Sequence, residues 1–154
     1  MTVETRTRTW GAVAARGAAA WSVAFGLVHV YWLVGGEVGL PPGTSLASNL
    51  PLLIIDVVAI PLCALAALVA LAPTRPWGSR VPRWLLNTAI CGVAVLLLVH
   101  AMPSVVDWVL LASGRLAVAD LDPMERFVTL LYEPVFLAGG LLFGLTGLGC
   151  LRGR

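Results

Sequence analysis

The sequence predicts an all-α fold: a four-helix transmembrane bundle that forms one domain over residues 1–154. Hydrophobic residues make up 59% of the chain and charged residues only 12%, and the mean hydropathy is +0.93. A soluble domain averages about a quarter charged residues and still exposes roughly a third of its unfolded surface, so lipid is the natural solvent for this chain. Four apolar runs also reach the length that crosses a bilayer.

Each predicted span is at least about 20 residues long, which is enough to cross a hydrocarbon core of ~30 Å. The first run is too long to be a cleaved signal peptide. The connections are short except for residues 109–126, where Asp122, Pro123 and Glu125 form a helix-start pattern that predicts a brief interfacial helix. The predicted spans cover residues 11–36, 50–72, 84–106 and 127–151.

The arginines predict the orientation of the bundle. Only Arg115 and Arg126 lie on one side of the membrane, and the remaining eight of the ten basic residues lie on the other side. The positive-inside rule therefore places both termini in the cytoplasm. The eight are Arg6, Arg8, Arg16, Arg75, Arg80, Arg83, Arg152 and Arg154.

Small residues on the fourth span predict close packing between helices. They let two helix backbones approach each other within the membrane. We expect this face to pack inside the bundle, with a contact between copies of the chain in a homo-oligomer as the alternative. The face comprises Gly139, Gly140, Gly144 and Gly147, with a G-x-x-x-G pattern at Gly140 and Gly144.

Four ionisable side chains lie inside the predicted spans: His29, Asp56, His100 and Glu133. Each lies about six or seven residues from the outer end of its span, which places all four roughly 9–10 Å deep at 1.5 Å per residue. Ionisable groups in a membrane are costly and mark functional sites. We therefore expect these four side chains to be the catalytic residues of one pocket. The alternative is that a His–carboxylate pair merely ties two helices together.

Helical spacing adds neighbours to this pocket, which we expect to have aromatic walls and to open toward the outer leaflet. Glu37 and Asp107 are expected at its mouth, with solvated helix caps as the alternative. Tyr31 and Trp32 have a second interpretation as interfacial anchors. The predicted substrate-binding residues are Trp21, Phe25, Tyr31, Trp32, Glu37, Ser104, Asp107, Tyr132 and Phe136.

Two motifs resemble a known family. The string His-Val-Tyr-Trp-Leu-Val-Gly-Gly at residues 29–36 resembles the signature of an uncharacterised family of small four-span bacterial membrane proteins. The string Arg-Phe-Val-Thr-Leu-Leu-Tyr-Glu-Pro at residues 126–134 resembles that family's second landmark, although Glu133 stands where the family usually has serine. The resemblance implies a multi-pass protein of the bacterial inner membrane and no particular activity. The mixture of Asp, Glu, His and Trp is also similar in kind to the pocket of emopamil-binding-type sterol isomerases.

The first functional hypothesis is an enzyme that performs acid–base chemistry on a lipophilic small molecule: an isomerisation, a cyclisation or an epoxide opening. Burial in a low dielectric favours the neutral form of a carboxyl group. Asp56 or Glu133 could then protonate the substrate, and the other carboxylate or a histidine could take a proton back. Aromatic faces would stabilise a developing cation. This hypothesis requires no bound cofactor or metal.

Two other classes of function stay open. His29 and His100 could ligate a haem, or could hold a divalent metal together with Asp56 and Glu133. A small transporter, a proton-relay element or an accessory membrane subunit would also use carboxylates at this depth. Nucleic-acid binding is not expected, because the sequence has no basic patch together with a known nucleic-acid-binding motif. The expected partners are the lipophilic substrate and membrane lipids.

Overall fold

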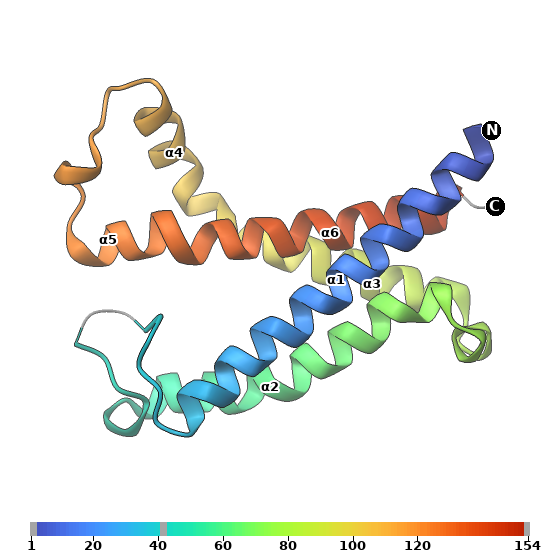
Figure 1. Ribbon diagram of the computed structural model, residues 1–154, viewed down its shortest axis with the longest axis horizontal. Helices are drawn as coiled ribbons and strands as arrows, with labels where there is room; N and C mark the ends of the chain where they lie inside the picture. Colours follow the sequence, from blue (N-terminus) through green and yellow to red (C-terminus); the bar gives the residue numbers. More distant parts are fainter. Residues whose placement is uncertain (1–2, 41–42, 153–154) are drawn as a thin grey trace.

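The computed structural model describes residues 3–40 and 43–152, which form helices and turns with no strand among them. Four helical segments are long and apolar enough to cross a membrane (Figure 1), which confirms the predicted fold class. These segments are Trp10–Leu33, Leu50–Thr74, Arg83–Ala112 and Pro123–Leu151.

Four long helices form the bundle, and shorter helical turns extend or connect them. The long helices are α1 (Val3–Leu33), α2 (Leu50–Leu71), α3 (Arg83–Ala101) and α6 (Glu133–Arg152). The shorter α-helices are α4 (Val105–Ala112) and α5 (Pro123–Phe127), and η6 (Val128–Tyr132) is a π-turn. The 3-10 turns are η1 (Leu46–Ser48), η2 (Ala72–Thr74), η3 (Pro76–Arg80), η4 (Met102–Ser104) and η5 (Val118–Asp120).

Helix α1 ends at Leu33 rather than at the predicted residue 36. Gly35 has a φ of +96°, a left-handed conformation that glycine adopts without strain. The Gly36 N–H then donates to the Tyr31 carbonyl at 2.9 Å, which closes the helix end. The apolar run continues past this point, so hydropathy alone overestimates the length of the helix.

The helix start predicted at Asp122 is confirmed. The Asp122 carboxylate accepts hydrogen bonds from the Met124 and Glu125 N–H groups at 2.7 and 2.8 Å, and Glu125 accepts one from the Asp122 N–H at 3.0 Å. This reciprocal arrangement satisfies N–H groups that a helix leaves unpaired at its start. The segment is not a separate interfacial helix, because α5 continues through η6 into α6 as one membrane-length element.

The bundle consists of two helix pairs made from consecutive spans. Helix α1 packs mainly on α2, and α3 packs mainly on α6, while α1 and α6 join the two pairs and α2 touches α3 little. Figure 1 shows the pairs meeting toward the end that carries both termini and diverging toward the other end. The diverging end is the one that the sequence predicts to face outward.

Two adjacent glycines of α6 allow two different helices to pack closely against it. A Cβ atom on Gly139 would lie 2.6 Å from the Trp21 ring of α1, and one on Gly140 would lie 2.8 Å from the Leu98 side chain of α3. A Cβ on Gly144 would meet nothing within 4 Å. The predicted close packing is therefore present at Gly139 and Gly140, and also at Gly147, where a Cβ would lie 3.3 Å from the Cys91 sulfur of α3. Gly144, the second glycine of the G-x-x-x-G pattern, does not form a helix contact here.

Both termini and the α2–α3 connection lie at the same end of the bundle in Figure 1. This end therefore gathers the arginines predicted on one side of the membrane, apart from Arg154, which lies outside the described residues. The cytoplasmic location of this end stays a prediction from the positive-inside rule.

Candidate functional site

The four ionisable residues form two His–carboxylate pairs. His29 on α1 lies with its Nδ1 atom 2.6 Å from Oδ1 of Asp56 on α2. His100 on α3 lies with its Nδ1 atom 3.2 Å from Oε2 of Glu133 on α6. Each pair joins the two helices of one packed pair, so the side chains do not form the single cluster that their equal depth predicted.

The His29–Asp56 pair is almost completely buried and incompletely bonded. His29 is 7% exposed and Asp56 is 1% exposed. The second carboxylate oxygen, Oδ2, and the second ring nitrogen, Nε2, are both buried and have no hydrogen-bond partner in the described part of the chain. A buried polar atom without a partner costs about 1–3 kcal/mol, so such atoms need an explanation in a native fold. The pair thus holds one free acceptor and one free ring nitrogen inside the bundle.

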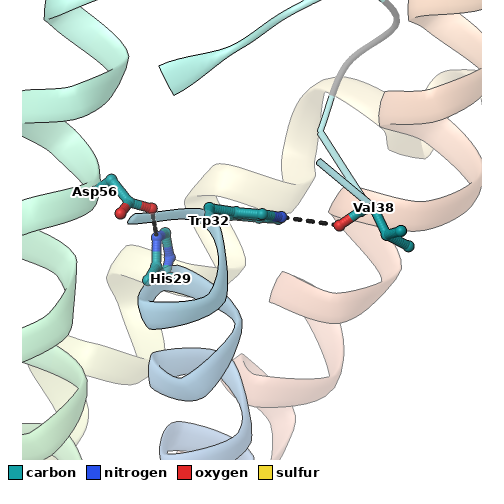
Figure 2. A network of polar contacts seen from close by, with 4 residues as sticks. All are labelled: His29, Trp32, Val38 and Asp56. Carbon is teal, nitrogen blue, oxygen red and sulfur yellow. Dashed lines mark hydrogen bonds and ion pairs between the residues drawn. The ribbon is translucent and has the colours of Figure 1, made fainter. Parts of the chain in front are cut away.

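Aromatic rings enclose the His29 imidazole on two sides. Phe25 and Trp32 each meet it in an edge-to-face arrangement, with ring centroids at 4.7 and 5.1 Å. The Trp32 indole N–H donates to the Val38 carbonyl at 2.8 Å (Figure 2). This bond fixes both the indole and the loop after α1, so Trp32 holds the imidazole edge in one position.

The His100–Glu133 pair has a different environment. Glu133 is buried, but the His100 side chain is 51% exposed. The His100 ring stacks on Phe136 with centroids at 3.9 Å, and Phe136 meets Phe25 at 5.4 Å. Two phenyl rings therefore lie between the imidazoles of the two pairs.

This separation bears on the haem and metal hypotheses. Among the residues that the structure describes, no three His, Cys, Asp or Glu side chains come close enough to hold one metal ion. His29 and His100 each direct Nδ1 at their own carboxylate, and Phe25 and Phe136 lie between them. The expected set of His29, His100, Asp56 and Glu133 around one metal, and the axial pair of histidines on one haem, do not match this arrangement.

A cavity of about 380 Å³ lies between α1, the η6–α6 segment and the loop after α1. Four of the predicted substrate-binding residues line it: Trp21, Phe25, Trp32 and Tyr132. Their rings form two roughly parallel pairs, Trp21 with Phe25 at 5.1 Å and Trp32 with Tyr132 at 6.2 Å. The predicted aromatic walls are therefore present.

Aliphatic residues complete the cavity, and the sequence interpretation did not include them. Ala24 and Val28 continue the α1 stripe of Trp21, Phe25 and Trp32 at helical spacing, a signal that was available. The others come from the loop and the start of the fourth span, which no periodicity connects. These are Val38, Gly39, Leu131 and Val135. Several lining residues are exposed, among them Val28, Val38 and Leu131, so the cavity opens onto the surface of the bundle.

The other five predicted substrate-binding residues lie elsewhere. Tyr31 is half-exposed, with its ring over Gly36, and Glu37 is exposed in the turn after α1. Ser104 is buried in η4, and the Asp107 carboxylate accepts a hydrogen bond from the Thr129 hydroxyl at 3.3 Å. Phe136 lies between the two His–carboxylate pairs. Glu37 and Asp107 therefore do not form the mouth of this cavity.

A π-turn sets the direction of Tyr132 and Glu133. Within η6 the Glu133 N–H donates to the carbonyl of Val128, five residues earlier. The next N–H in this register would serve the Thr129 carbonyl, but residue 134 is proline and has none. The Trp108 indole N–H supplies the missing donor at 2.7 Å. The turn thus lets Tyr132 line the cavity while its neighbour Glu133 faces His100; π-turns of this kind are frequent at functional sites.

Trp21 closes the inner end of the same region. Its indole N–H donates to the Val135 carbonyl at 3.0 Å, which joins α1 to α6. The bond lies one helical turn from Gly139, whose missing side chain leaves room for the indole. Both tryptophans of the cavity are therefore held by backbone carbonyls rather than by side chains.

Comparison with known proteins adds one finding. A family model described as "Protein of unknown function (DUF3995)" matches residues 22–143, a segment that contains both His–carboxylate pairs and most of the cavity lining. No curated protein and no solved structure matches the chain. The similarity to sterol isomerases thus rests on residue types alone.

Proposed function

Since this chain belongs to the DUF3995 family, whose function is unknown, we propose a function from its own geometry: it is a membrane-embedded enzyme that performs acid–base chemistry on a lipophilic small molecule. The observation that carries the proposal is the buried His29–Asp56 pair, which has two partnerless polar atoms and lies directly behind the aromatic wall of the cavity. Perturbed or unsatisfied ionisable groups beside a cavity are candidates for catalysis.

The cavity suits a ligand that is almost entirely hydrocarbon. Its volume of about 380 Å³ falls within the usual range of small-molecule sites, roughly 300–1,000 Å³. The indole N–H groups of Trp21 and Trp32 are already bonded to backbone carbonyls, so their faces rather than their donors meet the ligand. Among the lining side chains only the Tyr132 hydroxyl is left to contact a polar group. The exposed lining residues Val28 and Leu131 leave an opening at the surface, through which such a molecule would enter from the surrounding lipid.

The chemistry follows from the pair and its surroundings. In the proposed reaction, the Nε2–H of a protonated His29 adds its proton to one carbon of a substrate double bond. The π electrons form the new C–H bond and leave a cation on the neighbouring carbon. Neutral Nε2 then removes a proton from the next carbon, so the double bond moves and nothing else is consumed. Cyclisation and epoxide opening would use the same acid.

Three groups support this step in distinct ways. The Asp56 carboxylate balances the charge on the imidazolium and orients the ring through the 2.6 Å contact. The faces of Phe25 and Trp32 stabilise the substrate cation. Because Phe25 lies between His29 and the cavity, the ligand must displace its ring to reach Nε2.

A second candidate function is binding without chemistry, as in a lipophilic carrier or an accessory membrane subunit. The observation that favours it is that no carboxylate or imidazole is among the side chains that line the cavity. In that case His29–Asp56 and His100–Glu133 would stabilise the two helix pairs, as interhelical polar contacts do at about 0.6–2 kcal/mol each.

Solvent deuterium distinguishes the two candidates without knowledge of the substrate. The purified protein is incubated in D2O with lipids extracted from its host membrane, and the lipids it retains are analysed by mass spectrometry. An acid–base enzyme transfers solvent deuterons to carbon, so a retained molecule gains mass. We expect Asp56→Asn to retain the molecule but to slow deuterium incorporation by about 10²–10⁴-fold, the usual contribution of acid–base catalysis.

Two further variants test the cavity itself. Ala24→Phe places a ring in the cavity and leaves both His–carboxylate pairs intact. Val23→Phe adds the same ring at the neighbouring residue, which is 52% exposed and does not line the cavity. We expect loss of the retained molecule in Ala24→Phe only. Retention by Ala24→Phe would exclude this cavity as the site. A retained molecule that gains no deuterium would leave the carrier function, and an undiminished deuterium rate in Asp56→Asn would refute the role proposed for the His29–Asp56 pair.

A further inference from the structure

A second cavity lies at the opposite end of the bundle, where both termini gather. Its volume is about 520 Å³, and it lies between α1, η2, α3 and α6. Unlike the outer cavity it is lined by polar side chains from every one of these elements. They are Arg16, Thr74, Arg83, Asn87 and Thr146.

The two arginines have no anionic partner in this cavity among the described side chains. No carboxylate lines it, and within the part of the chain whose side chains are described, neither Arg16 nor Arg83 lies within 4 Å of a carboxylate oxygen. The Asn87 amide also has no hydrogen bond among the described residues. Two guanidinium groups and an amide therefore face the same space, and their side-chain donors have no acceptor among the described residues.

Local charge increases the preference for an anion. Of the eight acidic residues in the chain, only Glu4 belongs to this end of the bundle. Helix α3 begins at Arg83, and its N-cap residue, Pro82, provides no side-chain hydrogen bond, so the positive end of a 19-residue helix lies at the cavity. Among the side chains that the structure describes, none with a negative charge lies within 4 Å of either guanidinium group.

Exposed tryptophans at this end of the bundle indicate what surrounds a ligand of the inner cavity. Trp10, Trp77 and Trp84 belong to this end and are 63%, 41% and 70% exposed. Exposed tryptophans at one end of a spanning bundle are typical of the headgroup region of a bilayer. A ligand here is therefore within reach of both lipid headgroups and the aqueous phase.

We propose that this inner cavity binds a phosphate group, held by the guanidinium groups of Arg16 and Arg83 and by the Asn87 amide. Guanidinium forks match the oxygens of phosphate and form the strongest class of hydrogen bond to them. The phosphate belongs either to an anionic phospholipid or to a soluble phosphate compound. The proposal is independent of the function proposed for the outer cavity, since the two share no residue.

The test measures binding to the full-length protein in detergent. Dioleoylphosphatidylglycerol and inorganic phosphate are titrated separately, and native mass spectrometry gives the dissociation constant of each. We expect Arg16→Gln and Arg83→Gln each to weaken binding at least tenfold. Arg80→Gln is the matched control, because it removes the same charge from the same end but does not line the cavity.

Each outcome decides the proposal. Binding of the lipid alone identifies a headgroup site, and binding of inorganic phosphate alone identifies a soluble ligand. Weakening by Arg80→Gln equal to that by Arg16→Gln would show diffuse attraction to a positive end and overturn the proposal. Unchanged binding in all three variants would overturn it as well. Asn87→Leu, which alters no charge and should weaken binding several-fold, separates lost contacts from a misplaced span.

Discussion

Replacement of Gly139 by alanine tests how α1 is seated on α6 beside the outer cavity. The new Cβ would lie 2.6 Å from Cζ2 and 2.7 Å from Cε2 of the Trp21 indole, well inside the ordinary contact distance of 3.4–4 Å. The indole cannot simply retreat, because its N–H is bonded to the Val135 carbonyl at 3.0 Å. The substitution therefore forces either a strained contact or a broken hydrogen bond.

The expected cost follows from these two terms. A strained contact in a well-filled region costs about 1–3 kcal/mol, and a broken hydrogen bond in its place costs about 1 kcal/mol. Alanine also raises helix propensity by up to ~1 kcal/mol relative to glycine. Gly144→Ala has the same gain in propensity on the same helix but meets nothing within 4 Å. We therefore expect Gly139→Ala to be about 1–3 kcal/mol less stable than Gly144→Ala.

The assay is unfolding by sodium dodecyl sulfate in mixed micelles, followed by circular dichroism, which gives the free energy of unfolding of each variant. A Trp21→Phe background provides the coupling control, because a smaller ring makes room for the new Cβ and the cost of Gly139→Ala should fall below about 1 kcal/mol. Equal free energies of unfolding for Gly139→Ala and Gly144→Ala would refute the close packing of the Trp21 indole on Gly139.

Two further predictions concern the π-turn and the orientation. Trp108→Phe should lower the free energy of unfolding by about 1–3 kcal/mol, because it removes the indole donor of the Thr129 carbonyl. The loss should be small in a Pro134→Ala background, where the restored N–H of residue 134 replaces the indole. A double-mutant cycle of unfolding free energies measures the difference, and equal losses in both backgrounds would contradict the prediction. The second prediction concerns the arginine-rich end, which the positive-inside rule places in the cytoplasm. In a cysteine-free chain, Ser113→Cys should therefore react with a membrane-impermeant maleimide on intact cells, and Ser79→Cys should react only after permeabilisation. The reverse labelling would place the arginine-rich end outside.

Hydropathy was sufficient to predict the four spans. Apolar length is a one-dimensional property, so it predicted all four spans, and residue counting placed His29, Asp56, His100 and Glu133 at similar depth. The aromatic wall was also accessible, because Trp21, Phe25 and Trp32 share one face of one helix. The helix start at Asp122 was accessible too, because an N-cap hydrogen bond joins residues only two or three positions apart in the sequence.

What sequence could not supply was the rotation and partner of each helix. Depth alone does not distinguish one cluster from two pairs; the packing of α1 on α2 and of α3 on α6 decides this. The change of register at the π-turn directs Tyr132 and Glu133 to different neighbours, and no propensity encodes it. Arg16 and Arg83 were used only as markers of orientation, because their common cavity depends on four helical elements converging.

The pairing of consecutive spans has a consequence for how the chain enters the bilayer during synthesis. An isolated acidic residue inside a nascent span costs up to about 2.5–3.5 kcal/mol at insertion, the value at the centre of the span. Here Asp56 follows its histidine by one connection, and Glu133 follows His100 likewise. Each hairpin can therefore leave the translocon with its own acidic group already partnered, so no stage of insertion requires the other half of the protein.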